Sequence, residues 1–416
     1  MRKAAVIGAG VSGLATAHLL KDRFDVTVYE REDAPGGLIR CTTIEGSLFH
    51  TCGGHVFNTK HVDVLEWVRK FVNFDKEYIK ADRNSSIIFE NGLHVPYPIE
   101  NHVYYFEKDL QQRCIKDFLQ IASLGEQTYT NFEDFLRTRF GETLYGLYFS
   151  PYNEKVWRSP LSKIPLSWLA DKLPMPTIEE ILYNNMNHVE EKNFVHSTFW
   201  YPCKNGSQFF ADKLAEGLNI KYNSSIDEIL YYKETNLWKI KDAVYDCIVF
   251  CGNIKELPTI LSGHDIDAYS HEIESLQYHG TTTVFCEIDE NPYSWLYMPS
   301  RKYESHRIIC TGNFSPNNNA QGEMTATIEF TDKIDKDQIE KNLKLMPYHP
   351  RYITHQYNQY TYPIQSRDTA DMIKSLKTRL SNNGFYITGR FADWEYYNMD
   401  VAIKAAMNTC ESLLRS

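Results

Sequence analysis

The feature that most constrains the fold is a glycine-rich turn near the start of the chain, "KAAVIGAGVSGLATAHLL". An apolar run, Ala4–Ile7, leads into Gly8, Gly10 and Gly13 in the spacing G-x-G-x-x-G, and a helical pattern follows. A second apolar run, "DVTVYE", ends at Glu30, an acid about 20 residues downstream. Strand, tight turn, helix, strand and acid in this order predict a Rossmann-type unit that binds an adenine dinucleotide.

The residues of this turn have separate expected roles. Gly10 lets a pyrophosphate approach the backbone, and Gly13 allows the helix to pack closely on the strand. The helix begins near Val11 and Ser12 and offers unpaired N–H groups to the phosphates. Glu30 is expected to bind ribose hydroxyls.

A second glycine pair favours FAD over NAD. Gly36 and Gly37, in "REDAPGGLIR", follow soon after Glu30, where NAD dehydrogenases do not usually carry glycines. Near the other end, "NNGFYITGRFADWEYYNMDVAIKAA" predicts a strand at Phe385–Thr388, a turn, and a helix starting near Met399. Both features resemble the large FAD-binding family that includes amine oxidases, protoporphyrinogen oxidase and phytoene desaturases. In that family the late strand and helix cap the ribityl and pyrophosphate groups of the flavin.

Composition and charge exclude several partners. The chain has 44 Lys and Arg against 54 Asp and Glu, a net charge of −10, which argues against nucleic acid or an anionic membrane as the main partner. No apolar run approaches the about 20 residues of a membrane span, so no membrane insertion is expected. The start, "MRKAAVIGAG", enters a strand directly without a signal peptide, which predicts a cytoplasmic protein. Nine cysteines without metal-type spacing predict no metal site.

Several interior segments carry a more specific resemblance. They include "GGHVFNTKHVDVLEWV", "SPYNEKVWRSPLSKIPLSWLADKLPMP", "FWYPCKNGSQFFADKL", "HRIICTGNFSP" and "GRFADWEYYNMD", in this order. Together they resemble the UDP-galactopyranose mutase family, and more its eukaryotic-type branch than its compact bacterial one. The resemblance covers almost the whole chain. It implies FAD that is active when reduced, with NAD(P)H as a candidate reductant, and it leaves open whether the chain forms a homo-oligomer.

The resemblance also implies a reaction. The enzyme would interconvert the pyranose and furanose forms of UDP-galactose or a related nucleotide hexose, and so supply furanose for glycan biosynthesis. In the family, N5 of the reduced flavin attacks the anomeric carbon while the nucleotide diphosphate leaves. Such a site needs cations for the diphosphate and a closed, oriented pocket. The alternative is an FAD-dependent oxidase or desaturase of the amine oxidase or protoporphyrinogen oxidase type, which would want an apolar, uncharged channel.

Matching positions in these segments imply the catalytic and substrate-binding residues. Arg307 would clamp the diphosphate through its bidentate fork. Lys172 falls where the eukaryotic-type enzymes have a second diphosphate-binding arginine, although a solvated helix lysine is an equally good interpretation. Trp157 fits a core tryptophan equally well, and Phe314 stands where the family commonly has a tyrosine. The predicted substrate contacts are Tyr297, Tyr362 and Tyr396 at the phosphates, and Asn153, Trp157, Phe57, Asn101, Asn398 and Phe314 towards the nucleoside or sugar.

Paired glycines followed by a histidine, in "HTCGGHVFNTKH", complete the predicted cofactor site. In the family this segment lies against the isoalloxazine ring and shifts when the flavin is reduced. Gly53 and Gly54 would let the backbone meet the ring. His55, counted with Arg307 and Lys172 as catalytic, would sense the redox state near N5. The other predicted cofactor contacts are Gly8, Gly10, Val11, Ser12, Gly13, Glu30, Arg31, Gly36, Gly37, Leu38, Ile226, Gly389, Arg390, Met399, Asp400 and Val401.

The predicted fold class is α/β, with a Rossmann-type FAD-binding domain interleaved with a helical domain and a mostly antiparallel β-sheet domain. Residues 315–322, "SPNNNAQG", are predicted to be a flexible loop and a candidate lid. The predicted boundaries are 1–80, 200–255 and 380–416 for the FAD-binding domain, 105–200 for the helical domain, and 81–104 and 256–380 for the substrate domain.

Overall fold

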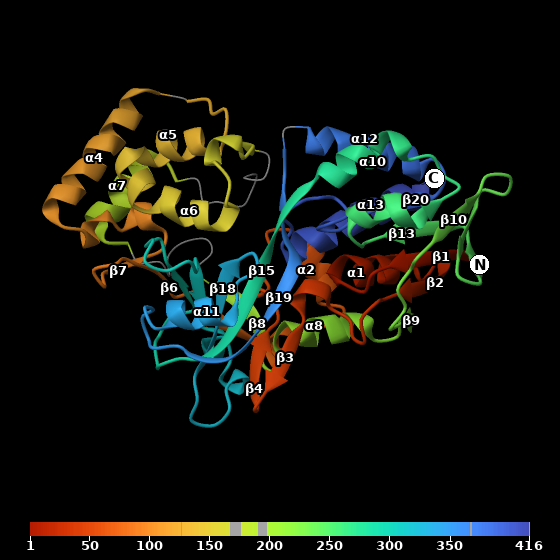
Figure 1. The fold of residues 1–416 in the computed structure, drawn as a ribbon, viewed down its shortest axis with the longest axis horizontal. Helices are drawn as coiled ribbons and strands as arrows, with labels where there is room; N and C mark the ends of the chain where they lie inside the picture. The colour runs from red at the N-terminus through yellow and green to blue at the C-terminus, as the bar shows by residue number, and fades with distance from the viewer. Residues whose placement is uncertain (126, 167–175, 190–197, 367, 416) are drawn as a thin grey trace.

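The computed structural model describes residues 1–125, 127–166, 176–189, 198–366 and 368–415. Its elements form three groups (Figure 1): a parallel sheet with flanking helices, a separate group of helices, and a large sheet with two long strands. This is the predicted fold class, which is confirmed.

The first group is built on a parallel sheet of five strands in the order β20-β13-β1-β2-β9. Strands from the beginning, middle and end of the chain meet in this sheet, so the domain is interleaved. Parallel strands covered on both faces are apolar throughout, as the runs in the sequence suggest. The strands are β1 (Arg2–Ile7), β2 (Phe24–Tyr29), β9 (Ile220–Lys221), β13 (Cys247–Phe250) and β20 (Phe385–Ile387).

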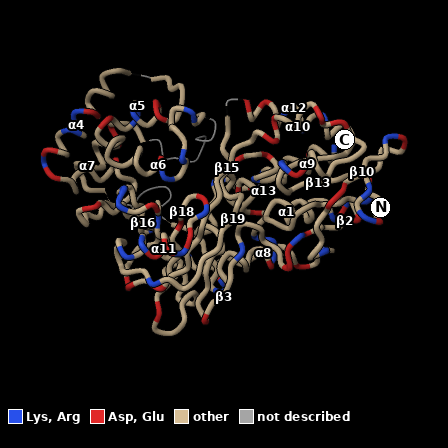
Figure 2. Tube along the Cα trace, in the orientation of Figure 1, with Lys and Arg blue, Asp and Glu red and all other residues tan. Residues whose placement is uncertain are grey.

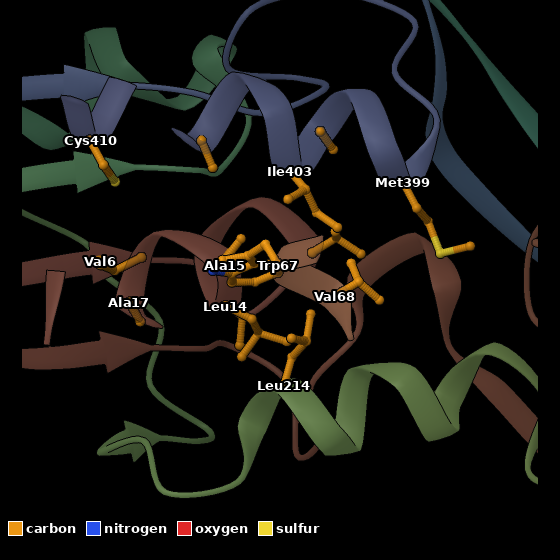
Figure 3. Close-up of a cluster of buried hydrophobic side chains, with 14 of the residues drawn as sticks. Val6, Leu14, Ala15, Ala17, Trp67, Val68, Leu214, Met399, Ile403 and Cys410 are labelled. Carbon is orange, nitrogen blue, oxygen red and sulfur yellow. The ribbon is translucent and has the colours of Figure 1, made fainter. Parts of the chain in front are cut away.

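Helix α1 (Val11–Leu20), which follows the glycine turn, is buried between two other helices. Figure 3 shows Ile403 of α13 (Met399–Arg415) on one side of α1 and Leu214 of α8 (Gly206–Ala215) on the other. Ile403, Leu14 and Leu214 are fully buried. This packing explains why α1 carries no polar face, and it fixes the start of α13 beside the glycine turn.

The opposite face of the parallel sheet carries a second buried cluster. Helices α9 (Leu257–Ile260), α10 (Asp267–Ser275) and α12 (Thr369–Ser381) share it with the strands β13 and β20. The predicted domain boundaries assigned these helices to the substrate domain, but their apolar faces pack against the nucleotide-binding sheet. A four-stranded sheet extends this group, with β10 (Ile229–Tyr232), β11 (Leu237–Ile240), β12 (Ala243–Tyr245) and β14 (Leu261–Ser262).

The large sheet has seven strands in the order β19-β15-β18-β17-β16-β6-β7. Neighbouring strands are antiparallel, apart from β16 and β6, which are parallel. The two long strands reach from this sheet towards the nucleotide-binding group (Figure 1). The strands are β6 (Ser85–Ile88), β7 (His94–Pro96), β15 (Gln277–Glu287), β16 (Trp295–Tyr297), β17 (Arg307–Ile309), β18 (Thr325–Thr331) and β19 (Arg351–Ile364).

The helical group packs on the β16 end of this sheet through one aromatic-rich cluster. Phe118, Phe132 and Phe135 are almost completely buried in it. Its helices are α4 (Lys108–Ser123), α5 (Phe132–Leu144), α6 (Ser150–Trp157) and α7 (Ile178–Asn187). The remaining elements are α2 (Val62–Val68), α3 (Phe74–Glu77), α11 (Lys336–Leu343), the pair β3 (Cys41–Ile44) and β4 (Ser47–His50), and the pair β5 (Tyr78–Asp82) and β8 (Thr198–Pro202).

Charged residues of both signs are interspersed along the chain (Figure 2). No helix within the described residues is long and apolar enough to cross a membrane. The described residues also contain no group of three or more His, Cys, Asp or Glu side chains arranged to hold a metal ion.

The predicted lid at 315–322 is instead held at several points in its first half. Ser315 Oγ and Asn317 Nδ2 both donate to the Cys203 carbonyl, at 2.9 and 2.8 Å. Asn318 is fully buried, and its Nδ2 donates to the Tyr201 hydroxyl at 3.0 Å. These side chains tie the first half of the segment to residues 201–203, and its movement as a lid stays a prediction.

Candidate cofactor and active site

A cavity of about 950 Å³ runs from the carboxyl ends of β1, β2 and β13 to the first turn of α13. The crevice beyond the carboxyl ends of parallel strands is where open α/β sheets bind nucleotides. Most of the predicted cofactor residues line it: Gly8, Gly10, Val11, Ser12, Gly13, Glu30, Arg31, Gly36, Gly37, Leu38, His55, Ile226, Arg390 and Met399, together with Asn398.

The glycine turn has the geometry that a bound pyrophosphate requires. A Cβ on Gly13 would lie 1.8 Å from the carbonyl oxygen of Gly8, so no side chain fits between helix and strand. A Cβ on Gly10 would meet nothing within 4 Å, because Gly10 faces the cavity. The backbone at Gly10 is therefore open to a ligand, while Gly13 holds α1 against β1.

Glu30 lies at the edge of this cavity with its carboxylate held by the backbone. The side chain is 7% exposed, and its oxygens accept hydrogen bonds from the N–H of Ala9 at 2.6 Å and of Glu32 at 3.0 Å. Arg31 and Glu256, which also line the cavity, form an ion pair at 3.2 Å. This end of the cavity suits ribose hydroxyls and an adenine.

The other end of the cavity contains buried polar atoms that need a partner. Within the described residues, His55 Nε2 and Arg390 Nε have no hydrogen-bond partner, although both are buried. Such atoms are rare in native proteins unless a water or ligand satisfies them. Polar atoms of a bound flavin would do so, so the residues present fit FAD, which His55 and Arg390 would help to hold.

The two glycines before His55 do not line the cavity. Gly53 has φ +68° and donates its N–H to the carboxylate of Glu329 at 2.9 Å. A Cβ on Gly54 would lie 2.5 Å from Cγ2 of Ile309 and 3.4 Å from the ring of Phe314. Glycine is therefore required at position 54 because the side chains of the large sheet pack against it. The predicted contact of its backbone with the flavin ring is not the reason.

Three more predicted cofactor residues lie just behind the lining. Gly389, at φ +123°, packs on Ser12 and donates its N–H to Asp393 at 3.0 Å, which shapes the turn that carries Arg390. Asp400 and Val401 belong to the first turn of α13, but the cavity is lined there by Met399 and Ala402 instead. Burial raises the pKa of Asp400.

Arg307 lies at the centre of a buried polar cluster on the large sheet. Its Nε donates to Glu329, and its Nη2 donates to the Tyr362 hydroxyl at 3.0 Å. The ring of Tyr362 stacks on that of Tyr396, with centroids 5.6 Å apart. The guanidinium of Arg390 lies 4.1 Å from the centre of the Tyr396 ring, which joins this cluster to the cofactor cavity.

The charges of this cluster are fixed by its burial. Burial opposes ionisation of Glu329, but the charge of Arg307 and the interactions with His306 together outweigh it and hold the pKa of Glu329 well below its usual range. Arg307 stays charged, because Glu329 raises its pKa against the opposing effect of burial. Burial, with the charge of Arg390 next in size, lowers the pKa of His55 to about 4, so this imidazole is neutral near pH 7.

Tyr297 reaches the same region from the neighbouring strand. It pairs with Arg307 across β16 and β17, and its hydroxyl accepts a hydrogen bond from Arg83 Nη2 at 2.8 Å. The Arg83 guanidinium also lies 5.1 Å from the centre of the Trp295 ring. The structure thus brings Arg307, Tyr297, Tyr362 and Tyr396 together, with Arg83 as a second cation.

Other predicted substrate residues have different surroundings. Phe57 is 4% exposed and packs against Phe74 and Phe210 in the nucleotide-binding core, so the expectation that it faces the sugar was wrong. Phe314 is 1% exposed among Trp295, Phe199 and Tyr201 beneath Gly54, so a tyrosine there would not simply add a ligand contact.

The remaining predictions concern the helical group. Trp157 is buried in the aromatic-rich cluster, which agrees with the interpretation as a core tryptophan. Asn153 Nδ2 donates to the carbonyl of Phe149, the residue before α6, and Asn101 Oδ1 accepts from Asn184. Lys172 lies outside the described residues.

Two charged residues of the site were missed by sequence reasoning. Glu329 stands alone in the strand "TATIEFT", and all seven of these residues are buried. A carboxylate in an otherwise apolar strand signals a buried partner, and this signal was available in the sequence. Arg83 was not predicted as a site residue, because the resemblance to the family slips by one position there.

Comparison with known proteins agrees with this geometry. A family model described as an NAD(P)-binding Rossmann-like domain matches residues 6–72. The UDP-galactopyranose mutase of Mycoplasma genitalium is 21% identical over 98% of this chain and 94% of its own length. The dTDP-fucopyranose mutase of Escherichia coli is 24% identical over 100% of this chain and 99% of its own length. A crystal structure of reduced UDP-galactopyranose mutase has a TM-score of 0.87 at 20% identity and covers 100% of this chain and 94% of that one.

Rossmann strand order, glycine turn and cavity define a flavoprotein that binds FAD through a Rossmann-type domain. Within that class, the chain is similar over almost its full length to a UDP-galactopyranose mutase and a dTDP-fucopyranose mutase. The two relatives come from bacteria, and affinity to the eukaryotic-type branch stays a prediction.

Proposed function

We propose that the chain is a flavin-dependent nucleotide-sugar mutase, an isomerase that interconverts pyranose and furanose forms of UDP-galactose or a related nucleotide hexose. The observation that carries the proposal is the buried Arg307, which joins Tyr362 beside the His55 end of the cofactor cavity. An isomerisation in which a diphosphate leaves and returns needs such a cation next to the cofactor. The names of the two full-length relatives support the same reaction class.

Reduced FAD, when bound, supplies the nucleophile for the anomeric carbon. Arg307 would hold the leaving diphosphate, since its Nη2 reaches Tyr362 while its Nε is occupied by Glu329. Its side chain is only 19% exposed, so its charge acts on a ligand with little screening by water. Tyr362 and Tyr396 would add hydroxyl donors to the phosphate oxygens, and Tyr297 with Arg83 would bound the same pocket.

His55 would orient the cofactor and leave proton transfer to other groups. A pKa of about 4 makes its imidazole neutral near pH 7, and its buried Nε2 has no hydrogen-bond partner among the described residues. A neutral imidazole can donate or accept one hydrogen bond to the ring as the redox state changes. This is the redox-sensing role that the sequence implies.

The alternative, an oxidase or desaturase, fits this site less well. An amine or polyene substrate calls for an apolar channel, whereas here Arg307, Arg390 and Glu329 lie next to the His55 end of the cavity. Arg307 and Arg390 carry two positive charges against the one negative charge of Glu329, which suits an anionic substrate group. A cytoplasmic location, reduction of the flavin by NAD(P)H and formation of a homo-oligomer stay predictions.

A panel of nucleotide sugars tests the proposal. The protein, reduced with dithionite or NADPH, would be incubated with UDP-galactopyranose, UDP-galactofuranose, and the pyranose and furanose forms of dTDP-fucose. We expect the reduced protein to convert at least one nucleotide sugar into its ring isomer, which chromatography separates from the substrate. The oxidised protein should form no isomer. No isomer from any substrate, or oxygen consumption in proportion to substrate loss, would overturn the proposal in favour of an oxidase.

A further inference from the structure

We infer that Glu329 is a positioning residue that couples the Gly53–His55 loop to Arg307, so that nucleotide binding and the redox state of the flavin influence each other through one buried carboxylate. This inference rests on the proposed function, because it takes Arg307 as the diphosphate ligand. The two oxygens of Glu329 have different partners, one on each side of the site.

The large sheet places these residues in one transverse row. Tyr297 pairs with Arg307, Arg307 with Glu329, Glu329 with Thr283, and Thr283 with Gln356. Residues directly opposite each other on neighbouring strands point to the same face. The row therefore runs from the proposed diphosphate end of the site, at Tyr297, to the strand β19 beside the cofactor cavity.

The cofactor loop is bound to this row at two points. Glu329 Oε1 accepts the N–H of Gly53 at 2.9 Å, and Gln356 Nε2 donates to the carbonyl of Thr51. His55 follows two residues after Gly53 and lines the cavity, and its unpartnered Nε2 lies 3.1 Å from where a Cβ on Gly53 would be. A change at the flavin that moves His55 is thus transmitted to the Gly53 amide, because Thr51 is fixed to the sheet.

The other oxygen of Glu329 faces Arg307 and His306. Oε2 accepts from Arg307 Nε and lies 3.4 Å from His306 Nε2. Glu329 is 1% exposed, so no solvent is available to replace a donor that withdraws. If the loop withdraws the Gly53 amide, the carboxylate depends more on Arg307 and holds it more firmly. If a diphosphate draws Arg307 away, the carboxylate depends more on the Gly53 amide. This reciprocity is what linkage between two sites requires.

A redox titration of the full chain with FAD bound tests the coupling without turnover. The midpoint potential of the flavin would be measured with and without saturating UDP, and again with dTDP. In the wild type we expect the reduced and oxidised forms to differ in nucleotide affinity by about tenfold, which is a shift of about 30 mV for a two-electron couple. In Glu329→Gln, which keeps the shape but offers one acceptor, the shift should fall below a third of that value.

Two further variants make the result decisive. Glu287→Gln, at an exposed ion pair with Arg351 on the same sheet, should keep the full shift. Glu329→Asp keeps the charge, but its shorter side chain cannot reach both the Gly53 N–H and Arg307. This variant should therefore bind nucleotide and still lose the shift in midpoint potential. The contrary result is a Glu329→Gln protein that no longer binds nucleotide beside a Glu329→Asp protein that keeps the full shift in midpoint potential. In that case Glu329 only neutralises Arg307, and the coupling is overturned.

The outcomes for the wild type separate the two proposals. Binding of UDP or dTDP without any change of potential overturns the coupling and leaves the mutase proposal intact. Absence of nucleotide binding to both redox forms overturns both, because Arg307 then has no diphosphate to hold. Retained FAD absorbance in each variant shows that the protein is folded when the potentials are compared.

Discussion

Among single residues, Arg307 contributes most to the proposed chemistry, and its removal is the simplest test of the binding role. Arg307→Ala should weaken binding of UDP by about 2 to 5 kcal/mol, because a desolvated charge pair is lost. Calorimetric titration would measure this, with Arg351→Ala at an exposed pair as the matched control. Unchanged affinity in Arg307→Ala would remove this residue from the site.

Gly54 tests whether the paired glycines serve packing or movement. The Cβ of Gly54→Ala would meet Cγ2 of Ile309 at 2.5 Å, so the variant should lose about 1 to 3 kcal/mol of stability through overpacking. Adding Ile309→Ala should restore part of the loss relative to the sum of the two single variants, as measured by denaturant unfolding. A Gly54→Ala protein of unchanged stability but without activity would instead support the sequence-based interpretation as a hinge.

His50 gives the protein a defined dependence on pH. It is fully buried, accepts the His55 N–H at Nδ1, and contacts the Tyr201 hydroxyl through Nε2. Burial, assisted by His55, lowers its pKa from 6.5 to about 3. The unfolded chain therefore binds this proton first as the pH falls. The contribution of His50 is fully present above pH 6.5 and declines below it, by about 1.4 kcal/mol per pH unit, until pH 3.

Unfolding free energies at pH 7 and pH 5 would measure this slope. In His50→Asn the decline between the two pH values should be smaller than in the wild type, even though the variant is less stable at pH 7. Equal slopes for the two proteins would show that His50 does not remain neutral in the folded state.

At the scale of elements, helix α6 holds the turn between β16 and β17. Lys155 Nζ donates to the carbonyls of Met298, Ser300 and Ser305, at 2.8, 2.5 and 3.0 Å. The two ends of this turn carry Tyr297 and Arg307, which pair across the strands. One lysine from the "PYNEKVW" segment thus sets the geometry of two predicted substrate residues.

Lys155→Met should therefore affect both stability and binding. Leaving buried carbonyls without a donor should cost about 1 to 3 kcal/mol of unfolding free energy, and nucleotide affinity should fall with it. Lys163→Met, at an exposed lysine of the same helical group, should change neither quantity. A Lys155→Met protein that is less stable but binds UDP normally would restrict Lys155 to a purely structural role.

Elements near the cofactor could be predicted from local signals. The turn at Gly8–Gly13, the acid at Glu30 and the helix that begins at Met399 each have a spacing that the backbone requires. The helices α10 and α12 carried no such signal, since an apolar helix face does not say which sheet it covers. The predicted boundaries place them in the substrate domain, whereas their apolar faces pack against the nucleotide-binding sheet.

Across the whole molecule, what sequence reasoning missed lies where distant segments meet. Phe57 and Phe314 occupy positions that the resemblance assigns to ligand contacts, yet packing against Phe210 and beneath Gly54 decides their surroundings. Glu329 lies 276 residues from Gly53, so the hydrogen bond between them has no local trace in the sequence. The site is assembled by the register of the large sheet, which residue patterns alone do not give.

The central claim is that the flavin acts as a catalyst in an isomerisation and is not consumed as an electron donor. An anaerobic cuvette containing fully reduced protein and an excess of nucleotide sugar tests this most directly. We expect many equivalents of ring isomer per flavin, while the flavin spectrum remains that of the reduced form. Reoxidation of the flavin by one equivalent of substrate, with product formation stopping there, would contradict the account and identify an oxidoreductase.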